Sequence, residues 1–355
     1  MIIVHIITAF GIGGAEKLLL NVMNKQVKEH SVYLIYLKPL NCLISEIDAR
    51  IEVKNIPISF STVSKLKKYY KRIKPDIIHT HLGHADILGS WSARNLDVKV
   101  FCTMHNIYFK KNFLDAVFFE IYKLLFLTVV KRGHIISISK AVENHVLNRL
   151  QIPKYRSHLL LNAIPLKEIL FNKRSSEKIN LLFVGRLEKQ KSIETLLKAV
   201  ENLKTIKLKK EFQLIIVGDG KLKNELEQLM KQLKLGTVVT FVGEQKYIDS
   251  YYEQADIFIL PSIWEGFGIV ILEAFRSKVA VIASNIEGPA ELIKNEVNGL
   301  LFKPKDHIQL SEKIVQLINN KKLRAKIAHN GYLTFTKKYQ IDNYVEKLNE
   351  LYENV

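Results

Sequence analysis

The segment ADIFILPSIWEGFGIVILEAF, residues 255–275, shows most clearly which fold class this chain adopts. The short apolar run Asp256–Pro261 predicts a buried strand, a glycine-containing loop follows it, and Ile269–Ser277 predicts a helix. A strand, a loop and a helix in this order form the repeating unit of a parallel sheet. The unit recurs after four more short runs: LLFVG (181–185), FQLIIVG (212–218), VVTFVG (238–243) and VAVIAS (279–284).

A similar series fills the first half of the chain. Its expected strands are Ile2–Ile7, Ser31–Leu37, Asp76–His79, Val98–Thr103 and Gly133–Ser137, with helices such as Ala15–Lys28 and Val63–Ile73 between them. The polar stretch Phe171–Lys178 separates the two series. We therefore predict an α/β protein with two doubly wound domains, residues 1–170 and 171–335, and a final helix at 336–355 that packs back on the first. Ligands of such sheets bind beyond the carboxyl ends of the strands.

Composition limits the class of protein and its partners. The 355 residues include 53 Lys and Arg against 35 Asp and Glu, a net charge of +18. This excess indicates an anionic partner, such as phosphates, an acidic membrane surface or nucleic acid. The two cysteines, Cys42 and Cys102, form no disulfide framework, which favours a reducing cytoplasm. The apolar stretch Phe113–Val130 contains three charged residues, so we expect no membrane-spanning helix.

Two glycine-containing loops follow predicted strands. Gly13 and Gly14 open the helix after the first strand, where free backbone N–H groups attract an anion. The third glycine of a dinucleotide fingerprint would fall on Glu16, which excludes that motif. Gly266 and Gly268 open the helix that starts at Ile269 in the same way. A tight turn without a ligand is the alternative for the first loop.

Charged side chains accompany the loops of the second half. Arg186 directly follows the strand LLFVG and Lys191 lies five residues later, a combination that suits a diphosphate. Glu265 lies in the loop before the helix at Ile269, and Glu273 lies on that helix. A carboxylate accepts two hydrogen bonds, so it can hold adjacent hydroxyl groups of a sugar or ribose. The alternative is that these are ordinary solvated surface charges.

Histidines gather after two predicted strands of the first half. His79, His81 and His84 follow Asp76–Ile78, and His105 follows the next strand. His79 and His81 project to one face of an extended segment, which would suit a metal ion. No Asp, Glu or Cys lies at a companion spacing, so we predict no metal site. His105 is better interpreted as a hydrogen-bonding group at a strand end.

Motifs along nearly the whole chain resemble one family. They are GIGGAE (11–16), IIHTHLGHADILG (77–89), TMHN (103–106), SISKAVENHV (137–146), GRLEKQKSIETLL (185–197), VGDGKLKNELE (217–227) and the segment at 255–275. They are similar to those of the retaining, nucleotide-sugar-dependent glycosyltransferases of family 4 (glycosyl transferases group 1). The resemblance implies a GT-B fold, in which two Rossmann-like domains face a central cleft. It implies acceptor binding by the first domain and donor binding by the second.

The resemblance also implies roles for individual residues. Arg186 and Lys191 would neutralise the departing diphosphate and so act as electrostatic catalysts. Glu265 would position the transferred sugar, Glu273 would hold the ribose, and His105 would contact the sugar near its hydroxymethyl group. The residues implied to bind the donor are Gly13, Gly14, Arg186, Lys191, Val242, Gly243, Gln245, Gly266, Phe267, Gly268 and Glu273. Val242, Gly243 and Gln245 would lie at the nucleobase.

The resemblance defines the expected reaction and substrates. It implies transfer of a hexose or N-acetylhexosamine from a UDP-sugar, favoured over a GDP-sugar, to a saccharide or lipid-linked saccharide in bacterial surface polysaccharide synthesis. No further cofactor and no metal are expected. The chain departs from the family at Ser192, where a glycine is usual, and at Trp264, where a smaller residue is usual. A GT-B sugar-nucleotide epimerase is the alternative enzyme.

The charge excess is concentrated in the first domain and suggests a membrane surface. A basic run on residues 65–74 comprises Lys65, Lys67, Lys68, Lys71, Arg72 and Lys74. Lys110 and Lys111 precede aromatic residues, namely Phe113, Phe118, Phe119, Tyr122 and Phe126. Basic groups beside exposed aromatics are typical of helices that lie on anionic membranes. We therefore expect a cytoplasmic protein, peripheral on the inner face of the membrane; a core helix under a solvated face is the alternative. A nucleic-acid-binding protein is less favoured because no known binding motif is present.

Overall fold

The computed structural model describes residues 1–40, 42–105, 113–167 and 177–355. The chain forms two compact units: unit 1 comprises Met1–Pro165 and Ile341–Val355, and unit 2 comprises Leu166–Gln340. Most of the predicted linker Phe171–Lys178 lies outside the described residues.

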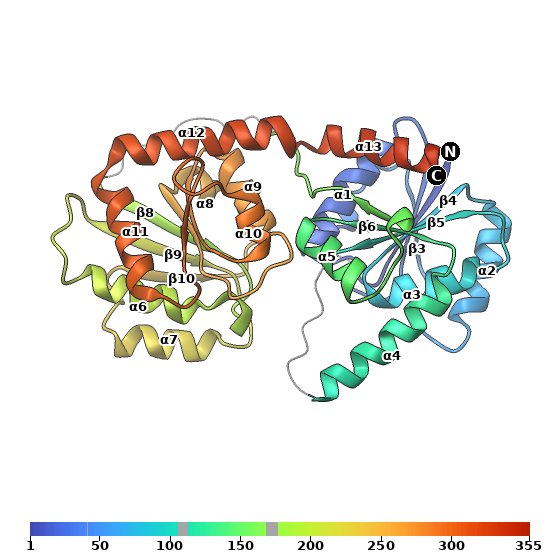
Figure 1. Ribbon diagram of the computed structural model, residues 1–355, viewed down its shortest axis with the longest axis horizontal. Coiled ribbons are helices and arrows are strands. Elements are labelled where there is room, and N and C mark those ends of the chain that lie inside the picture. Colours follow the sequence, from blue (N-terminus) through green and yellow to red (C-terminus); the bar gives the residue numbers. More distant parts are fainter. Residues whose placement is uncertain (41, 106–112, 168–176) are drawn as a thin grey trace. The chain divides into compact units, whose positions relative to one another are not determined.

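Unit 1 contains a seven-stranded, wholly parallel sheet with the order β3-β2-β1-β4-β5-β6-β7 (Figure 1). Its strands are β1 (Ile2–Ile7), β2 (Ser31–Tyr36), β3 (Glu52–Asn55), β4 (Ile77–His81), β5 (Lys99–Met104), β6 (His134–Ser137) and β7 (Ser157–Leu159). Its helices are α1 (Gly14–Gln26), α2 (Thr62–Ile73), α3 (Gly83–Ala93), α4 (Phe113–Val129), α5 (Lys140–Asn148) and α13 (Ile341–Asn354), with short 3₁₀ turns at Ile44–Glu46 and Lys154–Arg156.

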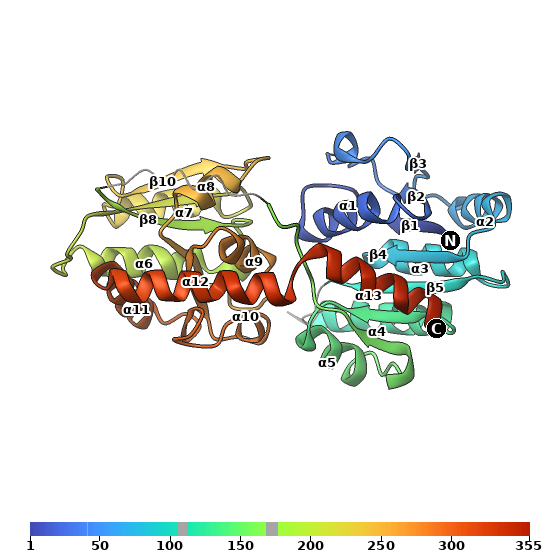
Figure 2. The same ribbon diagram turned by 90° about the horizontal axis from the view of Figure 1, so that it is seen from above.

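Both faces of this sheet are covered, which explains why its central strands β1, β4 and β5 are buried at nearly every position. Val4 and Ile6 of β1 pack toward α2 and α3. Ile3 packs on the opposite face, in a cluster that includes Tyr352 of α13. Helices α1 and α13 lie side by side on that face, whereas α2, α3 and α4 form a row on the other (Figure 2).

Unit 2 contains a six-stranded parallel sheet with the order β10-β9-β8-β11-β12-β13. Its strands are β8 (Ile179–Val184), β9 (Phe212–Val217), β10 (Val239–Gly243), β11 (Ile257–Leu260), β12 (Ala280–Ser284) and β13 (Leu300–Phe302). Its helices are α6 (Ile193–Leu203), α7 (Lys223–Gln232), α8 (Asp249–Gln254), α9 (Ile269–Arg276), α10 (Glu287–Leu292), α11 (His307–Asn319) and α12 (Lys321–Lys338), and a 3₁₀ turn spans Lys189–Lys191. Each unit is doubly wound, so the predicted α/β fold class is confirmed.

Several details differ from the sequence-based expectations. All ten predicted strands are present, but the short strands β3, β7 and β13 were not predicted. Strand β4 continues through His81, so His79 and His81 belong to the strand and do not follow it. The expected final helix consists of two helices that break at Tyr339 and Gln340. Within the described part of the chain, no helix has the length and apolar character needed to cross a bilayer.

One carboxyl group is buried in unit 1 with a hydroxyl as its hydrogen-bond partner. Asp86 in the first turn of α3 is 1% exposed, and the Thr80 hydroxyl donates a hydrogen bond of 2.8 Å to its Oδ1. Burial raises the pKa of Asp86 to about 7, although the bond from Thr80 acts in the opposite direction. Between the ordinary carboxyl pKa and pH 7, the folded state therefore holds a proton that the unfolded state has lost. This group's contribution to stability falls as the pH rises through that interval.

We predict that Asp86→Asn becomes progressively more stable than the native protein as the pH rises from 5 to 7. The amide does not titrate, so the difference in free energy of unfolding should grow by up to about 1.4 kcal/mol per pH unit and then level off. Urea unfolding of both proteins at pH 5, 6, 7 and 8 measures this difference in free energy of unfolding. Asp97→Asn, at an exposed position of the same unit, is the matched control and should show no such trend. A pH-independent difference for Asp86→Asn would contradict the prediction.

Ser192 has a left-handed backbone conformation at the start of α6, with φ 46° and ψ 46°. This explains why a glycine is usual at this position, because a Cβ atom is strained there. The Ser192 hydroxyl lies 2.9 Å from that of Thr195, so a local hydrogen bond partly offsets the strain. The departure noted in the sequence therefore leaves the loop in the glycine-type conformation.

We predict that Ser192→Gly is more stable than Ser192→Ala by about 1 kcal/mol. Both variants lose the hydroxyl, so their difference is the strain caused by the Cβ atom less the extra entropy that glycine gives the unfolded chain. Urea unfolding of the two variants side by side measures this difference. Equal stability would show that the strain does not exceed this entropy difference.

Candidate active site

Two loops of unit 2 are joined by an ion pair where the strand order reverses. Strands β8 and β11 are neighbours in the sheet, although the loops that follow them are 74 residues apart. Lys191 Nζ lies 2.5 Å from Glu265 Oε2, and the two side chains are only 11% and 15% exposed. The Ser262 hydroxyl donates a second hydrogen bond to Glu265 Oε2, at 3.3 Å. Two predicted site residues are thus brought into direct contact.

Gln190 links the same two loops through the backbone. Its side-chain amide donates to the Trp264 carbonyl at 3.0 Å, and its carbonyl accepts from the Ile263 N–H at 2.9 Å. These bonds fix the loop after β11 against the loop after β8. The Lys191–Glu265 pair therefore has little freedom to separate.

Arg186 has a different environment from Lys191. Its side chain is 70% exposed and makes a long contact of 3.4 Å from Nη1 to Glu188 Oε1. An exposed ion pair of this length contributes little stability. The guanidinium therefore remains accessible to an anion from solvent.

Glu273 is held in place by a residue that the sequence motifs did not indicate. It lies on α9 and is 8% exposed, and the hydroxyl of Tyr252 donates to its Oε2 at 2.9 Å. Tyr252 is fully buried on α8, and burial raises the pKa of its hydroxyl well above the ordinary value. Arg276 of α9 also contacts Asp249 of α8 at 2.6 Å. The orientation of Glu273 thus depends on the contact between two short helices.

Backbone geometry prepares the N-terminus of α9. Gly268 has φ +91° and is the N-cap, with no side chain capping the helix. First-turn N–H groups of such a helix can bind an anion. Phe267 is buried, whereas Gly266 is partly exposed. The predicted residues Gly266, Phe267 and Gly268 therefore form the turn between Glu265 and α9.

The loops after β8, β9 and β10 lie against one another at the same edge of the sheet. The Gly218 N–H donates to the Gly243 carbonyl at 2.7 Å, and a Cβ atom on Gly218 would lie only 1.9 Å from the Gly185 carbonyl oxygen. Gln245 folds back and donates to the Val242 carbonyl at 2.9 Å. The predicted nucleobase residues Val242, Gly243 and Gln245 are partly exposed in this loop.

In unit 1, Gly13 is the N-cap of α1 and Gly14 is its first residue. Gly13 is exposed, and the helix has no side-chain cap hydrogen bond. The Glu16 carboxylate folds back beside Gly13, where its Oε2 would lie 2.4 Å from an added Cβ atom. An anionic ligand at this helix N-terminus would have to displace that carboxylate.

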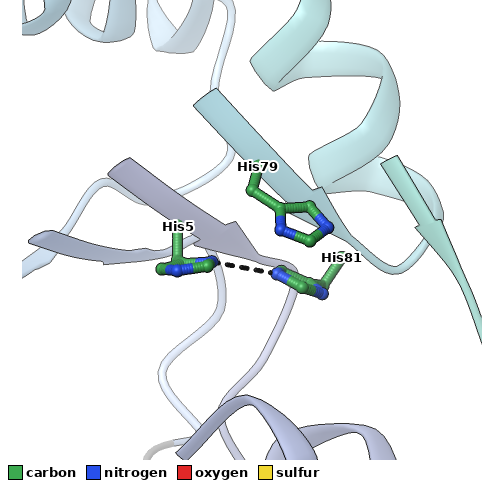
Figure 3. Close-up of side chains that lie close together, drawn as sticks. All are labelled: His5, His79 and His81. Carbon is green, nitrogen blue, oxygen red and sulfur yellow. Dashed lines mark hydrogen bonds between the residues drawn. The ribbon is translucent and has the colours of Figure 1, made fainter. Parts of the chain in front are cut away.

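His105 lies directly after β5 and is 8% exposed. Its Nε2 is 3.3 Å from Nδ1 of His81, whose Nε2 is 3.2 Å from Nδ1 of His5 on β1. Figure 3 shows His5, His79 and His81 together, with the dashed line joining His5 and His81. His84 is exposed and takes no part in this group.

His5, His79 and His81 are close enough to be considered as metal ligands, with ligand atoms within 4.8 Å of one another. However, both nitrogens of His79 already have partners, the Tyr352 hydroxyl at 2.5 Å and the Thr103 hydroxyl at 2.6 Å. The His79 ring also lies over the His81 ring, with centroids 4.2 Å apart and planes inclined by 34°. Rings that lie over one another in this way do not direct three lone pairs at one ion, so the arrangement is that of a hydrogen-bonded cluster.

The sequence is similar to those of known glycosyltransferases. The family model of "Glycosyltransferase Family 4" matches residues 12–168, and that of "Glycosyl transferases group 1" matches residues 167–334. A Campylobacter jejuni α-1,4-N-acetyl-D-galactosaminyltransferase that acts on a diphospho-undecaprenol-linked saccharide is 28% identical over 93% of this chain and 92% of its own. An uncharacterized glycosyltransferase of Methanocaldococcus jannaschii is 29% identical over 66% of this chain and 63% of its own.

The fold matches a solved glycosyltransferase structure throughout. Anabaena HepE, crystallised in complex with UDP, superimposes with a TM-score of 0.86 at 18% identity, over 100% of both chains. This likeness establishes the GT-B fold of the chain. Together with the two family models, it confirms the resemblance noted in the sequence: the chain belongs to the family 4, group 1 glycosyltransferases.

Proposed function

We propose that this glycosyltransferase moves a hexose or N-acetylhexosamine from a UDP-sugar to a saccharide or lipid-linked saccharide, with retention of anomeric configuration. The observation that supports it best is the largely buried Lys191–Glu265 pair, in the same loop region as the accessible Arg186, at the switch point of the unit 2 sheet. Cationic groups and free helix N–H groups at one sheet edge suit a nucleoside diphosphate. HepE has been crystallised with UDP and with UDP-glucose, which supports UDP over GDP.

In this proposal each group of residues contacts a different part of the substrates. Arg186 and Lys191 take the diphosphate, with the N–H groups of Phe267 and Gly268, and Glu273 takes the ribose hydroxyls beside Tyr252. Val242, Gly243 and Gln245 meet the base, while Gly13, Gly14 and His105 of unit 1 meet the phosphate or saccharide. Breaking the sugar–phosphate bond leaves charge on the diphosphate, and preorganised cations stabilise that charge as it develops.

Glu265 orients the sugar in this mechanism and does not attack it. Its carboxylate already accepts hydrogen bonds from Lys191 and Ser262, which lower its nucleophilicity. We infer that the acceptor hydroxyl attacks from the side on which the diphosphate leaves, with a departing phosphate oxygen accepting its proton. This route gives retention without a covalent enzyme intermediate. No metal ion is required in this scheme.

The acceptor is the less defined substrate. The Campylobacter jejuni relative acts on a saccharide carried by diphospho-undecaprenol. We propose an acceptor of the same chemical class, a saccharide on a lipid diphosphate, in the synthesis of a bacterial surface glycan on the cytoplasmic side of the membrane. This class places the reaction at an anionic lipid surface.

A row of exposed side chains on unit 1 supports membrane contact. Four residues of α4 are 41–65% exposed and follow one helix face: Val117, Ile121, Leu124 and Leu125. We call them the α4 stripe. Helix α3 lies between α4 and the basic helix α2, and its Trp91 is 48% exposed (Figure 1). An apolar stripe and a basic helix in one row of helices fit an anionic bilayer.

Two of the aromatic residues expected to make this contact, Phe119 and Phe126, do not make it. Phe119 and Phe126 are buried in unit 1, and Tyr122 stacks on Phe126. Lys110 and Lys111 lie outside the described residues, as do the side chains of Phe113 and Phe118. The expectation of exposed aromatics is therefore wrong for Phe119 and Phe126, because they point to the core. The aliphatic α4 stripe is the exposed apolar face.

We predict that UDP binds with micromolar affinity, more tightly than GDP, and that magnesium does not change the affinity. Arg186→Ala should weaken UDP binding by about 10- to 100-fold through the loss of charged hydrogen bonds, and should leave uridine binding unchanged. Isothermal titration calorimetry measures each of these affinities.

Lys189→Ala is the matched control, because it removes an exposed cation from the same loop. It should bind UDP as the native protein does. Equal effects of the two substitutions would reduce the role of Arg186 to general surface charge. Incubation with UDP-sugar and acceptor should yield a product with the donor's anomeric configuration by NMR. Epimerised nucleotide sugar without transfer would instead establish the alternative enzyme.

We predict that the protein floats with vesicles that contain anionic lipid and not with purely zwitterionic vesicles. The double variant Ile121→Glu/Leu124→Glu should reduce the bound fraction by about tenfold, because it removes apolar area and adds repulsion. Raising the salt concentration should weaken native binding.

The double variant Ile308→Glu/Leu333→Glu in unit 2 is the charge-matched control. These positions are 51% and 50% exposed, similar to the two residues of the stripe. It should float almost as the native protein does. Flotation that ignores lipid charge, or that is lowered equally by both double variants, would exclude the α4 stripe as the contact.

A further inference from the structure

Four side chains of unit 1 form a continuous series of hydrogen bonds that ends at His105. Gln26 Oε1 on α1 lies 2.8 Å from Nε2 of His5, and His5 Nδ1 lies 3.2 Å from Nε2 of His81. His81 Nδ1 lies 3.3 Å from Nε2 of His105. Register explains the proximity, because β1 pairs with β4 and β4 with β5. We call Gln26, His5, His81 and His105 the imidazole series.

The rings of the series are neutral at physiological pH. All three are buried, and burial lowers the pKa of His5 and of His105 to about 4 and that of His81 well below its ordinary value. A neutral imidazole has one N–H donor and one acceptor nitrogen. Each ring must therefore donate at one end of the series and accept at the other.

Gln26 determines the direction in which the series runs. Its amide nitrogen donates to Asn349 Oδ1 of α13 at 2.9 Å, so its oxygen faces His5 and can only accept. His5 then carries its proton on Nε2 and accepts at Nδ1 from His81 Nε2. His81 in turn accepts at Nδ1, so His105 carries its proton on Nε2.

The last atom of the series is a buried acceptor that pairs with none of the described residues. With its proton on Nε2, His105 presents a lone pair at Nδ1. That atom is buried and has no hydrogen-bond partner among the residues that the structure describes. His105 follows the carboxyl end of β5, where ligands of a parallel sheet bind. A buried unpaired nitrogen is unfavourable unless a ligand satisfies it.

We propose that Gln26, His5 and His81 are positioning residues that hold His105 as the Nε2–H tautomer, so that Nδ1 accepts a hydrogen bond from a substrate hydroxyl. The proposal deepens the transferase function proposed above and rests on it for the identity of the ligand. A fixed acceptor selects a saccharide hydroxyl and rejects a carbonyl, a carboxylate or a deoxy position. At the end opposite His105, the series begins with the Gln26 amide, which accepts no proton. The series therefore orients His105 and does not carry protons away.

The first test is the tautomer itself, read by NMR of protein with ¹⁵N-labelled histidine. The two ring nitrogens of a neutral imidazole have well-separated shifts, and His105→Gln assigns the His105 signals among the eleven histidines. We expect Nε2 of His105 to be protonated and Nδ1 unprotonated at neutral pH without any substrate. Protonation on Nδ1 would overturn the proposal, whether or not any variant folds.

The second test breaks the series at its far end. Gln26→Leu removes the acceptor and should give His105 a mixture of tautomers, whereas Gln26→Glu keeps an oxygen acceptor and should restore the native state. Turnover of Gln26→Leu should fall by about tenfold or more with UDP affinity unchanged, and Gln26→Glu should recover most of it. An unaltered His105 tautomer in Gln26→Leu would also overturn the proposal.

Two further variants separate this proposal from the function on which it rests. His158→Gln breaks the other imidazole pair of unit 1, His134 with His158 at 3.0 Å, and should change neither the His105 tautomer nor turnover. His105→Ala should lower turnover and leave UDP binding intact. If His105→Ala keeps full turnover while the tautomer is as expected, the role of His105 in the transferase reaction fails and the positioning series stands.

Discussion

Parallel strand pairing is the constraint on which both units depend. Every strand pair in the two sheets is parallel, so all carboxyl ends in a sheet lie at one edge. The order reverses between β1 and β4 in unit 1 and between β8 and β11 in unit 2, which leaves a gap between diverging crossover helices. Distant residues meet there: Lys191 with Glu265, and His5 with His81. The ion pair of unit 2 lies at such an edge, whereas the imidazole series of unit 1 starts at Gln26, under the face that α1 covers.

The two units stabilise their buried polar groups in different ways. In unit 2 two largely buried side chains of opposite charge, Lys191 and Glu265, form a direct ion pair. In unit 1 the polar groups lie under α1 and α13, and they are imidazoles that burial keeps neutral. In a series of neutral imidazoles, something must determine which nitrogen of each ring donates and which accepts. An ion pair has no such choice. Gln26 and Asn349 determine it from the two helices that cover the face.

Sequence patterns predicted the repeated strand–loop–helix segments. They did not predict which side chains from different segments come into contact. Apolar runs located ten strands, whereas β3, with the polar sequence EVKN, has no apolar signal. The loop motifs identified Lys191 and Glu265 separately, but their contact depends on the neighbouring positions of β8 and β11. Tyr252 and Gln26 belong to no motif, and only packing brings them to Glu273 and His5. Helix α4 is apolar around most of its circumference, so its sequence could not show that Phe119 and Phe126 face the core.

The contacts of Glu265 bear on how the proposed reaction is catalysed. Lys191 is balanced by Glu265 before any donor arrives, so the pair adds almost no net charge and would attract a diphosphate weakly. In the proposed reaction Arg186, which is exposed and loosely paired, would attract the anion from solvent. As the sugar–phosphate bond breaks, the charge that builds on the leaving oxygen competes with Glu265 for the Lys191 ammonium. An ammonium shared in this way interacts more strongly with the transition state than with the bound donor, and only such a difference raises the rate.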